Sequence, residues 1–224
     1  YQGEIDIQQD KDSKTGVPKK AVKVHAVFDQ RYRNPIYLTV VYPGKKATEV
    51  GQHLMEATRE IIPDKEITFT MDKWFNVGEL LEHIHQGGQK FVTLIKRHKN
   101  RIEEMERIPL EEFRMLTTEM GVTSIKVHLR NYNRNARLVV TEDLIDGIRT
   151  LYGYLTNDED TEEEKIREMY SGRWGIEFWF DEGGFLGIDK LPGIELNEVA
   201  MHLATKLVAY DAASAFRANV GGEY

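Results

Sequence analysis

The chain has 224 residues, of which 41% are hydrophobic, so it can bury a core as one large domain or two small ones. It contains no cysteine, which excludes disulfide bonds and thiolate metal sites and suits a reducing cytoplasm. No apolar run is long enough to span a membrane and no signal peptide is visible, so we expect no membrane partner. The formal net charge of −7 mildly disfavours a nucleic-acid binder.

The first part of the chain predicts short strands joined by turns. Alternating or β-branched residues define the strands, and the connections between them are short and polar, which is typical of an antiparallel meander. The predicted strands are Glu4–Gln8, Ala21–Phe28 and Ile36–Tyr42, with a turn or loop over Asp10–Lys20.

The next part predicts helices and strands in alternation. Helical spacing of apolar residues marks the helices, and β-branched or apolar runs mark the strands. The helices are Thr48–Ile62 and Val77–Gln86, and the strands are Glu66–Met71, followed by Asp72, and Lys90–Lys96. This order after a meander predicts an α/β fold, a mixed sheet covered by helices.

The run Lys96–Arg101 is the most basic part of the chain. It is either a solvated strand end or loop, or an edge that contacts phosphates. The residues by themselves favour neither interpretation.

A β-rich stretch follows a predicted connecting helix over Arg107–Gly121. Its strands are Ser124–Tyr132, Asn135–Thr141 and Thr150–Thr156, with a hairpin turn over Asn131–Asn135. No linker rich in Gly, Ser or Pro flanks this stretch. We therefore expect a β-rich insertion over residues 122–157 within a single domain that covers residues 1–224.

The segment from Asp158 to Glu168 carries much of the negative charge. It holds seven acids against Lys165 and Arg167, which is a net charge of −5. An acidic run before a helix is usually solvated and favours the positive end of the helix dipole. We therefore expect a solvated loop that leads into a helix.

The stretch Tyr170–Lys190 continues a pattern of apolar residues at three- and four-residue steps that begins near Thr161. This spacing predicts an amphipathic helix. Arg173, Glu177 and Asp181 are four residues apart, so they share one face of it.

Two interpretations of this helix compete. In the first, Trp174 and Phe178 dock the helix, and Arg173 and Glu177 form a helical ion pair worth about 0.3 kcal/mol. In the second, Glu177 is a metal ligand, which requires partners elsewhere in the chain. A last helix is predicted over Leu196–Phe216.

Two acids provide such partners for Glu177 in the late helix: Asp6 in the first strand and Asp72 at the end of a later strand. Site residues gather at the ends of adjacent strands of a mixed sheet. Carboxylates there can hold two hard divalent cations that promote in-line attack at a phosphodiester. The spacing by itself is weak support, because the chain has 37 acidic residues.

Several segments, taken in order, resemble one known family. The most specific is Tyr170-x-x-Arg173-Trp-x-Ile-Glu177 in the late helix. The other segments are Val22–Asp29, Pro35–Gly44, Ile67–Phe75, Leu80–Gly88, Phe91–Lys96 and Tyr154–Asn157. Together they cover nearly all of the chain, which resembles the catalytic domain of the DDE transposases of bacterial and archaeal insertion sequences, the cut-and-paste group.

The resemblance implies a ribonuclease-H-like mixed sheet flanked by helices, with the β-rich insertion before the last catalytic helix. It implies that Asp6, Asp72 and Glu177 bind two Mg²⁺ or Mn²⁺ ions. A water molecule would then cut a DNA strand, and the new 3′ hydroxyl would attack a second phosphodiester.

The resemblance also implies double-stranded DNA as the partner, a dimer on DNA, and a cytoplasmic, nucleoid-associated location. Tyr170 and Arg173 would position Glu177 and a nearby phosphate. The expected DNA-binding residues are Tyr170, Arg173, Lys73, Lys96, Arg97, Lys99 and Arg101.

Some positions depart from the family pattern. Lys73-Trp74 replaces the usual Arg-Gly after the second aspartate, and Gly184 replaces a lysine that contacts phosphate. The loss of that lysine predicts weakened strand transfer, unless Lys190 or the basic run compensates. A plain nuclease and a domesticated DNA-binding scaffold without catalysis therefore remain alternatives.

The identity of the first of the three metal-binding acids is also open. Asp6 is followed by Ile7-Gln8-Gln9 where the family usually has a small residue and threonine, so Asp10 and Asp12 remain candidates for the role. The family usually carries its end-recognition domain before the first aspartate. Because the chain starts at Tyr1, we expect it to be a fragment.

Overall fold

The computed structural model describes residues 8–11, 18–21, 23–41, 44–63, 66–145, 148–185, 192–193 and 195–220. The chain divides into two compact units. We call them the central unit, Ala47–Met55 with Ile62–Arg173, and the terminal unit, Tyr1–Lys46 with Glu56–Ile61 and Trp174–Tyr224.

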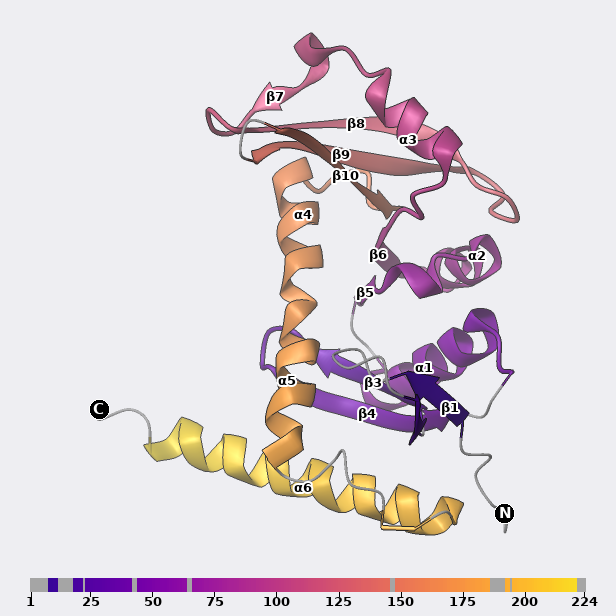
Figure 1. The fold of residues 1–224 in the computed structure, drawn as a ribbon, viewed down its shortest axis with the longest axis vertical. Helices are drawn as coiled ribbons and strands as arrows, with labels where there is room; N and C mark the ends of the chain where they lie inside the picture. The colour runs from indigo at the N-terminus through magenta and orange to yellow at the C-terminus, as the bar shows by residue number, and fades with distance from the viewer. Residues whose placement is uncertain are drawn as a thin grey trace. The chain divides into compact units, whose positions relative to one another are not determined.

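A six-stranded mixed sheet forms the centre of the central unit (Figure 1). Its strand order is β5-β6-β10-β9-β8-β7, and neighbours are antiparallel except β5 and β6, which are parallel. The strands are β5 (Thr68–Met71), β6 (Lys90–Leu94), β7 (Arg114–Met115), β8 (Met120–His128), β9 (Asn135–Ile145) and β10 (Ile148–Thr156). The stretch predicted to be β-rich thus forms β8 to β10 and continues the same sheet.

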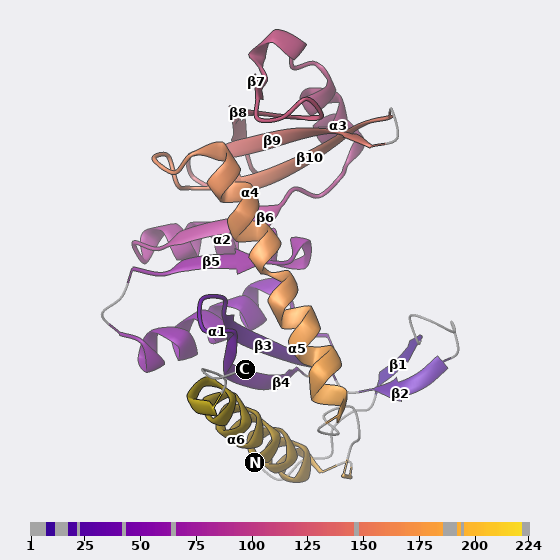
Figure 2. The ribbon, with the colours of Figure 1, turned by 90° about the vertical axis from the view of Figure 1, so that its left-hand side faces the viewer.

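Helices cover both faces of this sheet (Figure 2). Side chains along a strand alternate between faces. Along β9, Leu138 and Val140 join the apolar cluster that includes residues of α2 and α3, whereas Val139 joins the cluster that includes residues of α4. The helices are α2 (Gly78–Gln86), α3 (Lys99–Glu106) and α4 (Glu163–Gly172).

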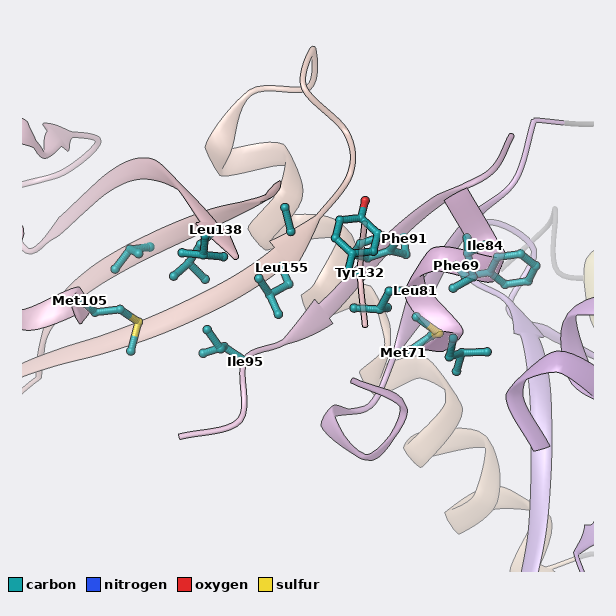
Figure 3. Close-up of a cluster of buried hydrophobic side chains, with 14 of the residues drawn as sticks. Phe69, Met71, Leu81, Ile84, Phe91, Ile95, Met105, Tyr132, Leu138 and Leu155 are labelled. Atoms are coloured by element: carbon teal, nitrogen blue, oxygen red, sulfur yellow. The ribbon is translucent and has the colours of Figure 1, made fainter. Parts of the chain in front are cut away.

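The larger cluster is the main core of the central unit (Figure 3). Leu81 and Ile84 of α2, Phe91 of β6 and Leu155 of β10 have no exposed surface. Because both faces of β6 are covered, its residues are apolar at successive positions instead of alternating with polar ones.

Helix α1 (Ala47–Ile61) contributes residues to both units. Met55 packs into the main core of the central unit. A Cβ atom on Gly51 would lie 2.4 Å from Cδ2 of Leu80, so the close approach of α1 to α2 requires glycine at this position.

Among its described residues, the terminal unit contains two antiparallel strand pairs, two complete helices and the end of α1. Val199 and Leu203 of the last helix pack against strand residues that include Leu38. Trp179 is buried, with its ring 5.9 Å from that of Tyr210. The elements are β1 (Gln8–Lys11), β2 (Pro18–Ala21), β3 (Lys23–Asp29), β4 (Asn34–Val41), α5 (Trp174–Phe185) and α6 (Leu196–Val220).

Two loop and helix predictions are wrong. The range Asp10–Lys20 is not simply a loop, because β1 and β2 within it pair with each other. The range Arg107–Gly121 is not a helix, since Pro109 begins a single 3₁₀ turn, Leu110–Glu112, and strands follow. Proline disfavours a helical conformation in the residue before it, which separates this turn from α3.

The predicted helix around Tyr170 is two helices. Arg173 separates α4 from α5, and its N–H bonds to the Tyr170 carbonyl at 3.0 Å, which tightens the chain at this point. Trp174 and Phe178 were expected to dock the helix, but each is 65% exposed. The buried aromatic residue of α5 is Trp179 instead.

Some predicted residues fall outside the described ranges, namely Asp6, Asp12, Lys190 and all of the predicted first strand except Gln8. No helix in the described ranges combines the length and the apolar character needed to cross a membrane.

We expect Leu155→Ala to lower the free energy of unfolding by about 2–5 kcal/mol, because it opens a cavity in a fully buried site. Ile148→Ala in the same strand should change it by less than about 0.5 kcal/mol, since Ile148 is 67% exposed. Urea denaturation followed by circular dichroism measures both. Equal losses would contradict this description of the core.

Candidate active site

Asp72 directly follows β5, at the edge where the parallel strands β5 and β6 end. The buried Thr93 of β6 donates its hydroxyl to the Asp72 carbonyl oxygen at 3.3 Å. Oδ1 of Asp72 accepts the Trp74 N–H at 2.8 Å and caps the 3₁₀ turn η1 (Lys73–Phe75). The backbone of Asp72 is thus tied to β6, and its carboxylate is oriented.

A second hydrogen bond holds the same turn. Nδ2 of Asn76 donates to the Leu94 carbonyl oxygen at 2.8 Å, which ties the residues after η1 to the end of β6. Sequence reasoning found Asp72 but missed Asn76 and Thr93. A lone threonine in an apolar strand indicates a hydrogen bond to the neighbouring strand only once that neighbouring strand is known.

The basic segment, Lys96–Arg101, follows β6 at the edge that carries Asp72. Arg97 and Lys99 are exposed, and Lys96 is half-buried. Arg101 is engaged in the protein, since it pairs with Glu104 and donates to the carbonyl oxygen of His128. Both earlier interpretations were incomplete, because α3 begins inside this segment.

The sequence carries a signal for α3. Ile102 and Met105 are three residues apart, and Met105 is buried. Glu103 has basic partners four residues away on both sides, Lys99 at 3.9 Å and Arg107 at 3.5 Å. Such pairs support an exposed helix.

Glu177 lies on α5 of the terminal unit and is exposed. Asp72 belongs to the central unit, so each carboxylate is placed within its own unit. Asp10, the alternative first acid, is on β1, where its backbone pairs with Lys19. Within the described ranges, no group of three acids or histidines is arranged to hold a metal ion.

Tyr170 and Arg173 are held together at the end of α4. The Tyr170 ring is buried, 5.4 Å from the ring of Tyr154. Cζ of Arg173 lies 5.4 Å from the centroid of the Tyr170 ring, a cation–π contact. This burial suits Tyr170 to positioning Arg173, which directly precedes the helix that carries Glu177.

The acidic run before α4 is only partly the solvated loop predicted from its charge: four of its seven acids are exposed, whereas Asp158 is buried. Asp158 is 2% exposed, and it accepts hydrogen bonds from the Asp160 and Thr161 N–H groups and from the Thr161 hydroxyl. Lys90 of β6 pairs with the same carboxylate at 3.1 Å. The run is therefore fixed to the sheet.

Arg137 of β9 holds the other side of this run. The Arg137 guanidinium is buried and donates to the Asp158, Glu159 and Thr161 carbonyl oxygens. It also pairs with Glu163 at the start of α4, at 2.5 Å. Two buried opposite charges thus set where α4 begins, and α4 in turn carries Tyr170 and ends at Arg173.

The pKa of the Asp158 carboxyl follows from these contacts. Burial alone raises this pKa, but the hydrogen bonds from Thr161 and Lys90 outweigh burial and bring it below its ordinary value of 3.8. The carboxylate is therefore ionised at neutral pH.

The available donors fit a hard cation. The sequence offers carboxylate oxygens and no thiolates, a donor set suited to Mg²⁺ or Mn²⁺. Asp72 adds an oriented carboxylate, because the Trp74 N–H donates a hydrogen bond to its Oδ1.

Comparison with known proteins identifies the family of the chain. Residues 5–211 match the family described as the transposase DDE domain. The chain belongs to that family, which confirms the resemblance seen in the sequence. No curated protein sequence matches the chain.

The fold is similar to that in a solved structure, the cryo-EM structure of a piggyBac transposase synaptic complex with hairpin DNA. The sequence identity is 12% and the TM-score is 0.54. The match covers 92% of this chain and 42% of the other, so this chain spans less than half of that transposase. The mixed α/β fold of the ribonuclease-H type, with helices flanking the sheet, is thereby confirmed.

We expect the free energy of unfolding to fall as the pH drops below about 4. Asp158 has a pKa below 3.8 in the folded chain, so its contribution is complete above 3.8 and is lost as the pH falls through the folded value. Urea titrations at pH 7, 4 and 3 measure this loss.

Asp158→Asn should lower stability at pH 7 and flatten the decline between pH 4 and 3. Asp160→Asn is the matched control, because Asp160 is exposed and lies two residues from Asp158. A decline as steep in Asp158→Asn as in the unmodified chain would contradict this role.

Proposed function

We propose that this chain is the catalytic domain of a DNA transposase that cuts phosphodiesters and transfers strands. The main support is the placement of Asp72, held by Thr93 and Trp74 at the edge where the basic segment begins. An oriented carboxylate beside exposed cations suits a phosphate ester as the reacting group. On this proposal, residues 1–224 act as one catalytic domain, with residues 122–157 as its β-rich insertion.

The proposed metal ligands are Asp6, Asp72 and Glu177. When bound there, two Mg²⁺ or Mn²⁺ ions would supply activation of the attacking oxygen and stabilisation of the leaving oxygen. The chain's own contribution is orientation: the Trp74 N–H holds Oδ1 of Asp72, and Thr93 holds its backbone.

The proposed partner is double-stranded DNA, bound by a dimer, and DNA as the substrate implies a nucleoid-associated location. Arg173 would orient a phosphate, with Tyr170 holding its guanidinium. The residues proposed to bind phosphates directly are Lys73, Lys96, Arg97 and Lys99. Arg101, also expected from the sequence, is engaged with Glu104 and the His128 carbonyl oxygen.

One observation favours a plain nuclease as the second candidate. The family lysine is replaced by Gly184, and α5 continues through Phe185, so this helical position offers no side chain to a phosphate. A chain that cuts DNA need not then join strands. A scaffold without catalysis is the remaining alternative.

Nicking of supercoiled plasmid in Mn²⁺ or Mg²⁺ tests the proposal. We expect Asp72→Ala and Glu177→Ala each to reduce nicking by on the order of 10³-fold or more, as for residues that act as one catalytic unit. Glu168→Ala, which removes another exposed acid, should leave nicking unchanged. No nicking by the unmodified chain, together with no metal binding by calorimetry, would reject catalysis and favour the scaffold.

Gly184→Lys tests the distinction from a plain nuclease. It places a cation at the family's position on α5, so we expect the ratio of joined to nicked product to rise several-fold. Gly183→Lys is the matched control, because it adds the same charge about 100° away around the helix. Equal effects of both variants would contradict a specific role for position 184.

A further inference from the structure

The turn between β8 and β9, residues 128–134, is fixed on the first turns of α2. We call it the hairpin tip. Nδ2 of Asn131 donates to Oε1 of Glu79 at 2.8 Å, and the Asn133 N–H donates to Oε2 of Glu82 at 3.0 Å. Figure 1 shows this turn beside α2 and the start of α3.

The backbone of Arg130 has a particularly close contact with α2. A Cβ atom on Gly78 would lie 1.9 Å from the Arg130 carbonyl oxygen, so this packing requires glycine. The next residue, Asn131, has a φ of 61°, in the left-handed region that asparagine tolerates. The position of Arg130 is therefore set by its backbone, which leaves its side chain available.

The hairpin tip is also bonded to the basic segment. Arg101 donates to the His128 carbonyl oxygen, which links α3 to the end of β8. Asn76 links the turn after Asp72 to Leu94, shortly before that segment. Through these contacts, all within the central unit, the hairpin tip lies beside the start of α2, which follows the Asp72 turn, and beside Arg101 of the basic segment.

The cations of these three segments fall into two groups. Arg101 and Arg134 are engaged with protein acids, Glu104 and Glu82 respectively. In contrast, Arg130 is exposed and forms no ion pair with any residue in the described ranges. Among described residues, the exposed Lys73 and Arg97 and the half-buried Lys96 also form no ion pair.

We propose that Arg130 binds a backbone phosphate of duplex DNA and extends the phosphate-binding surface from Lys73 and the basic segment to the hairpin tip. This inference rests on the proposed function for the identity of the partner. An arginine with a fixed backbone and no acidic partner suits a phosphate, because its backbone needs no ordering and no ion pair must be broken.

Affinity for a fluorescent duplex, measured by anisotropy between 50 and 200 mM salt without divalent metal, tests the proposal. Loss of one phosphate contact should weaken binding about equally for unrelated sequences and reduce the slope of log affinity against log salt by about 0.9. We expect Arg130→Ala to show both effects and Arg130→Lys to retain most of the slope. Arg107→Ala is the control, because it removes an exposed arginine paired with Glu103 from the opposite end of α3.

The outcomes separate this inference from the proposed function. An unchanged slope in Arg130→Ala, or equal changes in Arg130→Ala and Arg107→Ala, would overturn the inference even if the chain nicks plasmid. Absence of salt-dependent DNA binding by the unmodified chain would overturn it too. A reduced slope specific to Arg130→Ala would support it even if no nicking occurs, in which case the catalytic proposal alone fails.

Discussion

The parallel pairing of β5 with β6 is the constraint on which the candidate site depends. Parallel strands end at the same edge of a sheet, so the residues after both strands meet there whatever their separation along the chain. This brings Asp72 together with the basic segment. The bonds made by Thr93 and Asn76 then convert a strand end into a fixed turn with an oriented carboxylate.

The buried charges at the start of α4 fix this helix on the face of the sheet opposite to the one that α2 and α3 cover. Burying Arg137 and Asp158 is unfavourable unless each charge is paired and hydrogen-bonded, and both are, by several donors or acceptors. Their geometry fixes the first turn of α4 against the sheet. The buried Tyr170 anchors the last turn of α4. Helix α4 is thus fixed at both of its ends, and Arg173 follows directly and contacts the Tyr170 ring.

Sequence reasoning succeeded where local pattern decides structure. The helices α1 and α2 and the strands β5 and β6 follow from apolar periodicity and from turn residues such as Gly87 and Gly88. It failed where long-range contacts override local pattern. The charge of the acidic run predicted a solvated loop. The sequence pattern could not show that Arg137, which is far away in the sequence, binds this run.

The sequence also did not predict which of the aromatic residues of α5 are exposed. Trp174, Phe178 and Trp179 are all apolar, and helical spacing did not identify Trp179 as the buried one. The choice depends on where Tyr210 of α6 lies relative to α5. Sequence periodicity describes one helix, whereas burial depends on its neighbours.

The sequence by itself determined the type of most elements, the position of Asp72 after a strand, and the family through the Tyr170-x-x-Arg173-Trp-x-Ile-Glu177 pattern. Only the tertiary structure decided that the basic segment enters a helix beside the hairpin tip, that Asp158 of the acidic run is buried, and that Thr93 supports Asp72. The reason is physical: helix and strand formation depend on neighbours in the chain, whereas burial and hydrogen-bond partners depend on residues brought together by strand pairing.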